Sequence, residues 1–284
     1  MNKYRIRKKF TNFIVHACLT ILALIWIFPL FWVIMTSFRA GKGSYSSTFF
    51  PDKLTLNNYV SLFTDTDVFN FPQWFLNTLV VAIFSCILST FFIVSIAYVT
   101  SRLRFKSRKL LLNVALVLGM FPGFMAMIAI YYILKGIGMT QGVLKLVSLV
   151  LVYAGGSGIL QFYVAKGFFD TIPISLEEAA RVDGAGRFRI FATVILPLTV
   201  PGLVATGIFS FINGWNEYLF ASTFMKSYEN WTLPIGIASF SGQYATNWGT
   251  LMAGAVLITL PVVIMFLLLQ KHLVSGMTAG AVKQ

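Results

Sequence analysis

Residues 175–201 read SLEEAARVDGAGRFRIFATVILPLTVP, and this stretch decides the fold because it sets a short polar helix between two long apolar segments. The Ser175 hydroxyl can act as the N-cap of that helix, and Glu178 can reach back to complete a capping box. Alanines favour the helix interior, and Gly184 suits the left-handed position that follows a last turn. The pattern therefore predicts a helix of about two turns over residues 176–183.

A helix this short is marginal alone, so we expect it to pack against a partner. One face collects four residues at helical spacing: Leu176, Ala179, Ala180 and Asp183. Phe188 and Phe191 are expected to anchor the loop on the next apolar segment, which Pro197 and Pro201 should kink. From these residues alone, an amphipathic connector on the membrane surface explains the segment equally well.

The composition is that of a membrane protein. The chain has 284 residues, of which 57% are hydrophobic and 11% charged, whereas soluble proteins average about 25% charged. The net charge of +13 could suggest nucleic acid, but the basic residues flank apolar segments and no nucleic-acid motif occurs. The two cysteines and two histidines are isolated, which predicts neither a disulfide framework nor a metal cluster.

Six uncharged segments are long enough to cross a bilayer, which takes about 20 residues: 13–37, 75–101, 110–134, 146–165, 190–216 and 248–270. The first is too long for the apolar region of a signal peptide, and no cleavage motif follows it. Glycines at 155, 156 and 158 interrupt the fourth segment, where they either let helices approach closely or break the helix, and we favour close packing. We expect one all-α transmembrane domain over residues 1–284.

Basic residues set the orientation. Sixteen of the 22 Lys and Arg lie in the N-terminal arm, the second and fourth loops and the tail. The positive-inside rule puts that side, with both termini, in the cytoplasm, as for a multi-pass protein of the plasma or inner membrane. The two larger loops, 38–74 and 217–247, then lie outside. Trp74, near the second span, is typical of an interfacial anchor.

Two motifs resemble a known family. Glu178-Ala179-Ala180-x-x-Asp183-Gly184-Ala185, followed by Ile195-Leu196-Pro197, resembles the EAA loop of ABC importer permeases. The tail 273–283, LVSGMTAGAVK, resembles the end of carbohydrate-importer permeases, most similarly the second permease subunit of maltose/maltodextrin transporters. The resemblance covers essentially the whole chain. It implies the type I ABC importer permease fold, with six transmembrane helices and a cytoplasmic EAA coupling helix.

In that family the EAA helix docks on a cytoplasmic ATPase subunit and transmits its closure. Carried over, the coupling contact comprises Glu178, Ala179, Ala180, Asp183, Gly184, Leu196 and Pro197. The tail from Ser275 to Gln284 is a further expected contact. The chain contains no G-x-x-x-x-G-K-[ST] phosphate loop. We therefore expect a translocation subunit that is not an enzyme and holds no cofactor, with ATP and Mg²⁺ bound by the partner ATPase subunit.

The resemblance also implies partners. They are a second, different permease subunit, two cytoplasmic ATP-binding subunits, an extracytoplasmic sugar-binding protein, the sugar and membrane lipid, but no nucleic acid. The loop 217–247 corresponds to a family loop that enters the binding protein's sugar site. Its Trp231 and Tyr244 could meet sugar or serve equally well as interfacial anchors.

A sugar path is predicted at the end of the fifth span, at Asn213, Trp215, Asn216 and Glu217. Asn213 and Asn216 share a helix face, although helix–helix hydrogen bonding or emergence into water explains them as well. Malto-oligosaccharide is the expected substrate; importers of galacto-oligosaccharides, raffinose-type sugars or glycerol phosphate have similar permeases. An ion-coupled carrier is disfavoured because the spans contain no charged residue. A membrane enzyme is disfavoured because catalytic groups do not cluster.

Overall fold

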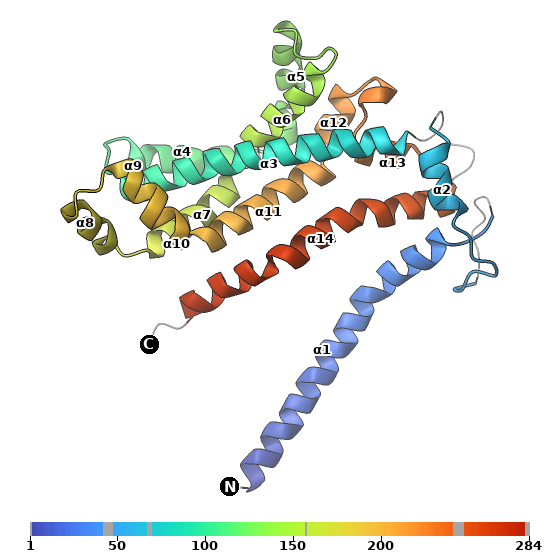
Figure 1. Cartoon of the computed structure of the whole chain (residues 1–284), viewed down its shortest axis with the longest axis horizontal. Helices are drawn as coiled ribbons and strands as arrows, with labels where there is room; N and C mark the ends of the chain where they lie inside the picture. The colour runs from blue at the N-terminus through green and yellow to red at the C-terminus, as the bar shows by residue number, and fades with distance from the viewer. Residues whose placement is uncertain (1, 42–47, 67–69, 157, 241–246, 282–284) are drawn as a thin grey trace. The chain divides into compact units, whose positions relative to one another are not determined.

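A computed structural model describes residues 2–41, 48–66, 70–156, 158–240 and 247–281 (Figure 1). Within these residues the chain is helical, with one isolated β-bridge between Arg39 and Leu54 and no strand. Contacts divide the chain into two units: Met1–Asn70 with Ile237–Thr259, and Phe71–Gly236 with Leu260–Gln284. The all-α class is confirmed, and the single transmembrane domain over 1–284 stays a prediction.

Three helices contain a continuous apolar stretch long enough to cross a membrane. They are α1 (Asn2–Ser37), α3 (Phe71–Arg102) and α14 (Trp248–Ala281), with mean hydropathies of 2.5, 2.7 and 2.7 over their most apolar windows. They contain the first, second and sixth predicted spans. In α1 large apolar side chains are exposed around the helix, as at Phe13 (71%) and Trp26 (74%). A helix that is apolar all round suits a bilayer.

The other three predicted spans are each bent within the membrane-length segment. The third comprises α4 (Arg108–Gly119), η1 (Gly123–Ala126) and α5 (Met127–Gly136), the fourth α6 (Leu144–Gly156) and α7 (Ile159–Thr171). The fifth comprises α9 (Arg187–Ile190), η2 (Phe191–Ile195), α10 (Leu196–Leu198) and α11 (Val200–Asn216). The bends are 88°, 52° and 78°. Six spans result if each bent pair crosses once, so that count stays a prediction.

The bends have identifiable causes. Pro122 follows the end of α4, and a proline disfavours helix at the residue before it. The expected kink near Pro197 and Pro201 is confirmed, and a π-helical turn, η2, precedes it. At Gly155 and Gly156 of the fourth span our preference for close packing is wrong, whereas a Cβ at Gly158 would meet the Ile93 side chain at 3.7 Å, an ordinary contact. A Cβ added at Gly155 or Gly156 would meet nothing within 4 Å, and α6 ends there.

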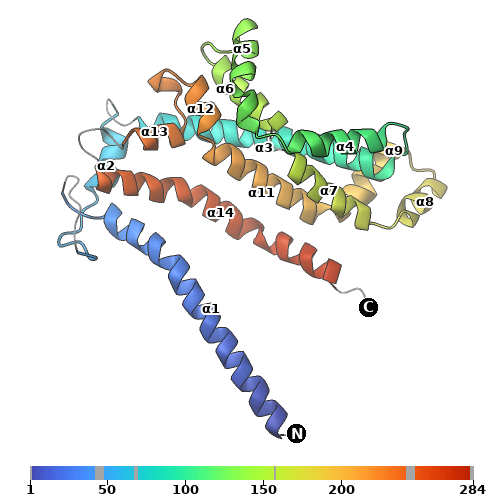
Figure 2. The ribbon, with the colours of Figure 1, turned by 180° about the vertical axis from the view of Figure 1, so that it is seen from behind.

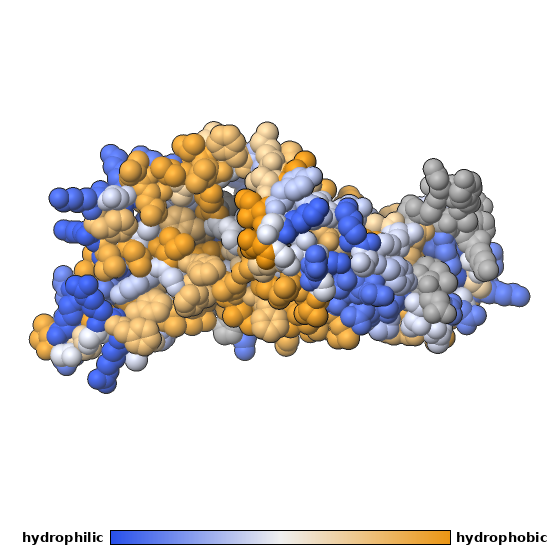
Figure 3. All heavy atoms as spheres, turned by 90° about the horizontal axis from the view of Figure 1, so that it is seen from above, coloured by the Kyte–Doolittle hydropathy of each residue, from blue (hydrophilic) through white to orange (hydrophobic). Residues whose placement is uncertain are grey.

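In the second unit α3 packs against α6, α7 and α11 (Figure 2). Its contact with α11 runs along small residues. A Cβ at Gly214 would lie 2.7 Å from the Ser85 Oγ, and the Ser89 and Ser210 hydroxyls are 3.2 Å apart. Small residues let membrane helices approach closely and exchange hydrogen bonds. Much of the protein face seen in Figure 3 is nonetheless apolar, as expected of a surface that meets lipid.

The remaining helices are short. In the first unit α2 (Asn57–Thr64) is tied to the end of α1, because the Asn58 amide donates to the Ser37 carbonyl at 2.8 Å. Between α7 and α9 lies α8 (Ser175–Val182). After α11 come α12 (Leu219–Phe224), η3 (Tyr228–Asn230) and α13 (Leu233–Ser239).

Candidate functional site

Helix α8 forms where the sequence predicts it, within one residue at each end. Gly184 has φ +80°, which is the left-handed conformation expected after the last turn. Its amide donates to the Arg181 carbonyl at 3.0 Å, and the Ala185 amide donates to the Ala180 carbonyl at 3.0 Å. These two bonds form a Schellman motif, which satisfies carbonyls that a helix end leaves free. Glycine is favoured at 184 because side chains disfavour this φ.

The predicted capping box is wrong. Ser175 is already the first helical residue, the preceding Ile174 has helical dihedrals, and no side chain caps the helix. Backbone carbonyls take that role instead. The Leu176 amide donates to the Pro173 carbonyl at 3.3 Å, and the Glu177 and Glu178 amides donate to that of Ile174 at 2.9 and 3.1 Å. The turn before α8 thus satisfies its first amides, which leaves Ser175 and Glu178 exposed.

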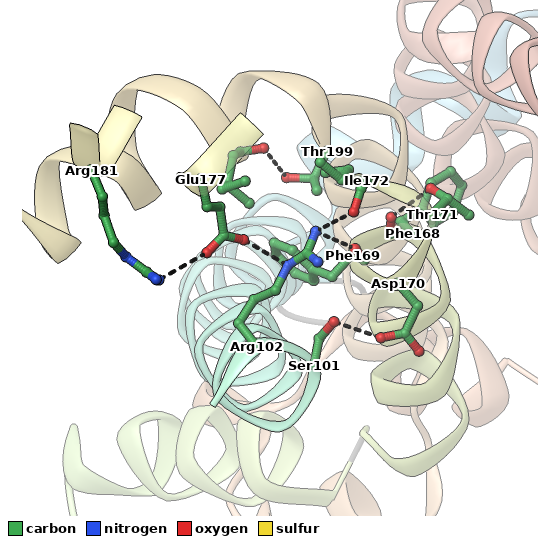
Figure 4. Close-up of polar contacts among 11 residues, drawn as sticks. Ser101, Arg102, Phe168, Phe169, Asp170, Thr171, Ile172, Glu177, Arg181 and Thr199 are labelled. Atoms are coloured by element: carbon green, nitrogen blue, oxygen red, sulfur yellow. Dashed lines mark hydrogen bonds and ion pairs between the residues drawn. The ribbon is translucent and has the colours of Figure 1, made fainter. Parts of the chain in front are cut away.

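A buried ion pair ties α8 to the end of α3. The Arg102 Nε lies 2.9 Å from the Glu177 Oε1, and their side chains are only 6% and 4% exposed (Figure 4). The contact is electrostatic rather than a well-aligned hydrogen bond, since neither atom has a hydrogen-bond partner. Arg181 lies 3.8 Å from the other Glu177 oxygen, but it is 57% exposed. Removing one partner of a buried pair leaves an uncompensated charge, so the two residues depend on each other.

The same guanidinium also holds the end of α7. The Arg102 Nη2 donates to the carbonyls of Phe169 and Ile172, at 2.7 and 2.8 Å. Figure 4 shows the head of Arg102 between these carbonyls and the Glu177 carboxylate. A cation is favourable at a helix C-terminus because the last carbonyls there lack partners. We call Arg102, Glu177 and these two carbonyls the Arg102 node; it joins α3, α7 and α8.

Beneath α8 lies an apolar cluster from α3, α7 and the 190–195 segment. Its buried members are Ile93, Val94, Ala97, Phe162, Ala165, Phe169, Ile172, Ile190 and Ile195. Ala180 and Leu196, two of the predicted coupling residues, pack against it. Phe191 does so too, with its ring centroid 4.6 Å from that of Tyr98 of α3 rather than on the fifth span that we predicted. Phe188 is 81% exposed, so its prediction as an anchor is wrong, because the chain turns it away from the cluster.

The other predicted coupling residues lie on the surface. Glu178, Ala179, Asp183, Gly184 and Pro197 are exposed. Two large apolar side chains accompany them on α8, Leu176 at 42% and Val182 at 88% exposure. The structure therefore divides the predicted set into an exposed group, which lies on α8, in the turn after it and at Pro197 of α10, and an inward pair that joins the cluster. Whether the exposed group contacts another subunit stays a prediction.

The residues of the predicted sugar path have different surroundings. Asn213 and Asn216 are exposed on α11, on one face as expected. Trp215 is fully buried, stacks on Phe211 with a ring-centroid distance of 5.5 Å, and presents no free face. Glu217 accepts from the Phe220 and Ala221 amides, at 2.8 and 3.0 Å, and so caps α12. Their contact with sugar stays a prediction.

At the other end of α3, neutral groups hold the segment 228–233. The Asn77 amide donates to the carbonyls of Glu229 and Trp231, both at 3.0 Å, and the Leu233 amide donates to the Thr78 hydroxyl at 2.6 Å. Trp74 is fully buried, so it is not the interfacial anchor that we predicted. Its Nε1 donates to the Tyr228 carbonyl at 3.2 Å.

Aromatic rings complete this contact, which we call the Trp74 clasp: Trp74, Asn77, Thr78 and the segment 228–233. The Trp74 ring lies 5.2 Å from that of Tyr228 and 5.7 Å from that of Trp231, between centroids. Gly236 lets this indole approach, because a Cβ there would lie 2.0 Å from its ring. Tyr244, predicted as a sugar contact or anchor, lies outside the described residues.

Sequence reasoning missed the Arg102 node and the Trp74 clasp. In the sequence, Arg102 is one of the basic residues of the second loop that set the orientation, and Glu177 carries no pattern of its own. Their pairing joins residues 75 positions apart, and no local pattern encodes it. A weak signal for the clasp exists in Asn77 and Thr78, which are polar groups inside an apolar span and so require partners.

Comparisons with known proteins agree with this architecture. The family described as "Binding-protein-dependent transport system inner membrane component" matches residues 93–279. Over 269 residues the chain is 34% identical to the galactooligosaccharides transport system permease protein GanQ of Bacillus subtilis (strain 168), covering 94% of each chain. Over 266 residues it is 35% identical to the maltodextrin transport system permease protein MdxG of the same organism, covering 93% of this chain and 94% of that one.

A solved structure shares the fold. A chain of a bacterial ABC transporter involved in the import of the acidic polysaccharide alginate superposes with a TM-score of 0.74. It is 21% identical, and the match covers 93% of this chain and 96% of that one. The similarity confirms the predicted fold class of ABC importer permeases.

Proposed function

This chain belongs to the family of binding-protein-dependent transport system inner membrane components, and from this premise we propose that it moves malto-oligosaccharides across the membrane. The chain is a permease subunit of a carbohydrate ABC importer. The observation that supports the finer statement is its 35% identity to a maltodextrin permease along almost the whole chain. Nearly equal identity to a galactooligosaccharide permease makes galacto-oligosaccharides the second candidate.

The proposal gives α8 the role of the coupling helix. An eight-residue polar helix with exposed Glu178, Ala179, Asp183 and Val182 offers a ridge with small side chains at its centre. Such a ridge suits a groove on a cytoplasmic ATP-binding subunit, which would bind ATP and Mg²⁺. Closure of that subunit would move α8 as a packed element between two discrete arrangements.

The remaining parts of the proposal concern topology and partners. Both termini lie in the cytoplasm of a cell whose plasma or inner membrane holds the chain, in accord with its basic loops. The chain pairs with a second permease subunit and two ATP-binding subunits, which supply the hydrolysis that this chain lacks. A sugar-loaded extracytoplasmic binding protein docks on the outer side, where the loop 217–247 reaches it.

Uptake and binding experiments test the substrate. The complex is purified in detergent through a tag on this chain, and the co-purifying subunits and the genetically linked binding protein are identified. That binding protein is then titrated with maltotriose and, in parallel, with a galacto-oligosaccharide of equal length. Tight binding and transport of maltotriose alone support the proposal, whereas transport of the galacto-oligosaccharide alone replaces it with the second candidate.

Two substitutions test the coupling role. Asp183→Lys reverses a charge on the outward face, and Gly184→Pro prevents the left-handed turn that ends α8. Both should abolish sugar uptake while the chain stays in the membrane at normal abundance. Asp52→Lys, the same charge reversal at an exposed position of the loop 38–74, is the matched control and should leave uptake intact. Undiminished uptake by both α8 variants would contradict the role.

A further inference from the structure

The single helix α3 carries both the Arg102 node and the Trp74 clasp. It has 32 residues and is therefore about 48 Å long, at about 1.5 Å per residue. Arg102 is its last residue, and Trp74 lies in its first turn. Figure 1 shows α3 running as one rod from the region of α8 and α9 to that of α12. A displacement applied at one end of this rod therefore reaches the other.

At its Arg102 end, the attachment of α8 is mainly electrostatic. In the described part of the chain, Ala180 is the one α8 residue that packs against the apolar cluster, whereas Leu176 and Val182 are exposed. The Arg102–Glu177 contact of 2.9 Å is buried. Because an ion pair shielded from water is screened little, it holds α8 to α3 more firmly than an exposed pair would.

At its other end, α3 grips the segment 228–233 through several neutral bonds. Asn77 holds two carbonyls at 3.0 Å, and Thr78 accepts the Leu233 amide at 2.6 Å. The Asn77 and Thr78 side chains are buried, so the segment cannot shift relative to α3 without leaving these two polar groups unpaired. The segment therefore moves with the helix.

We propose that Arg102 is a positioning residue that transmits displacement of α8 along α3 to the segment 228–233, and in the reverse direction. This inference rests on the proposed function, because it takes α8 as the site of the ATP-binding subunit and 228–233 as part of the outer loop. The coupling between the two sites is then reciprocal. A demonstrated effect of one end on the other is required, since connection in space alone does not establish coupling.

The test uses the whole complex in lipid nanodiscs, with ATP hydrolysis measured with and without its sugar-loaded binding protein. Arg102→Met combined with Glu177→Met removes both charges and leaves no lone buried ion, so it should disturb folding less than either single change, although the carbonyls of Phe169 and Ile172 lose their donor. The expected result is continued basal hydrolysis, with stimulation by the binding protein reduced about tenfold, a typical size for coupling between sites. A purely structural role for the pair would lower abundance or basal hydrolysis without this selective loss.

Lys166→Met is the matched control. It removes an ion pair of 2.6 Å at the same end of the unit, but both of its partners belong to α7. Stimulation should stay within about twofold of the unmodified complex, because this exposed pair does not reach α8. The inference would be overturned if stimulation by the binding protein fell equally in the control and the double variant, or if it stayed normal in the double variant.

A conservative variant keeps the inference testable if the double variant does not accumulate. Arg102→Lys retains the charge but not the planar fork that reaches three partners, so partial loss of stimulation at normal abundance is expected. Unchanged stimulation in Arg102→Lys would then overturn the inference. Failure of the proposed function has a different signature, because the unmodified chain would then co-purify with no ATP-binding subunit.

Discussion

The two ends of α3 hold their neighbouring segments by different physical means. The Arg102 node uses one desolvated guanidinium for three helices, with little apolar contact from α8. The Trp74 clasp uses a buried indole, two other aromatic rings and four neutral hydrogen bonds. One attachment thus depends on a single side chain and the other is shared among many. The comparison teaches that the α8 attachment is the one a single substitution can release.

The largest effect is expected at the node. Glu177→Ala leaves Arg102 buried without its carboxylate, and breaking a buried pair costs about 3–5 kcal/mol. Amides of residues 175–182 should therefore exchange hydrogen much faster, as measured by mass spectrometry on the membrane-embedded chain. Glu178→Ala, at the adjacent exposed position, should change the free energy of opening of α8 by less than about 0.5 kcal/mol. Similar exchange in the two variants would show that the pair does not hold α8.

A smaller effect is expected at the clasp. Asn77→Ala removes two hydrogen bonds from a buried amide to the carbonyls of Glu229 and Trp231, for about 1–3 kcal/mol, while the aromatic packing remains. Protease cleavage within 226–233 should rise modestly. Asn216→Ala, which truncates an exposed amide on α11, provides the comparison and should leave cleavage unchanged. If Asn77→Ala released its segment as fully as Glu177→Ala releases α8, the contrast between the ends would be wrong.

The turn after α8 should contribute less to stability than either the node or the clasp. Gly184→Ala places a side chain at φ +80° with open space around it, so the cost is backbone strain alone, about 1 kcal/mol. The rate of hydrogen exchange at the α8 amides measures this cost. Gly186→Ala is the control, because its φ of −68° suits any residue and its Cβ would also meet nothing. An equal response at both glycines would argue against the left-handed turn.

The smallest effect is expected for the exposed ion pair of α7. Lys166→Gln removes a 2.6 Å contact with Asp170; the two side chains are 14% and 46% exposed, far more than those of the Arg102–Glu177 pair taken together. Exposed pairs four residues apart contribute about 0.3–0.5 kcal/mol. The thermal midpoint of the detergent-solubilised chain should shift by less than in any variant above. If Lys166→Gln lowered the thermal midpoint as much as Glu177→Ala does, burial would not explain why the Arg102 node is strong.

Local features of this fold were predictable from sequence, and distant pairings were not. The limits of α8, the left-handed Gly184 and the kink near Pro197 follow from rules that act within a few residues. The capping box failed because the carbonyls of Pro173 and Ile174 already satisfy the first amides. Apolar runs predicted six membrane-length segments but could not show that three of them bend. Arg102 and Glu177 meet only through packing of α3, α7 and α8.

The exposed apolar side chains of Val182 and Phe188 have a consequence for biogenesis. Both stand in the polar loop between membrane segments, at 88% and 81% exposure. On a chain synthesised without its companions they would expose apolar surface to chaperones and membrane proteases. Cells should therefore match synthesis of this protein to that of its assembly partners, and orphan copies should be cleared rapidly.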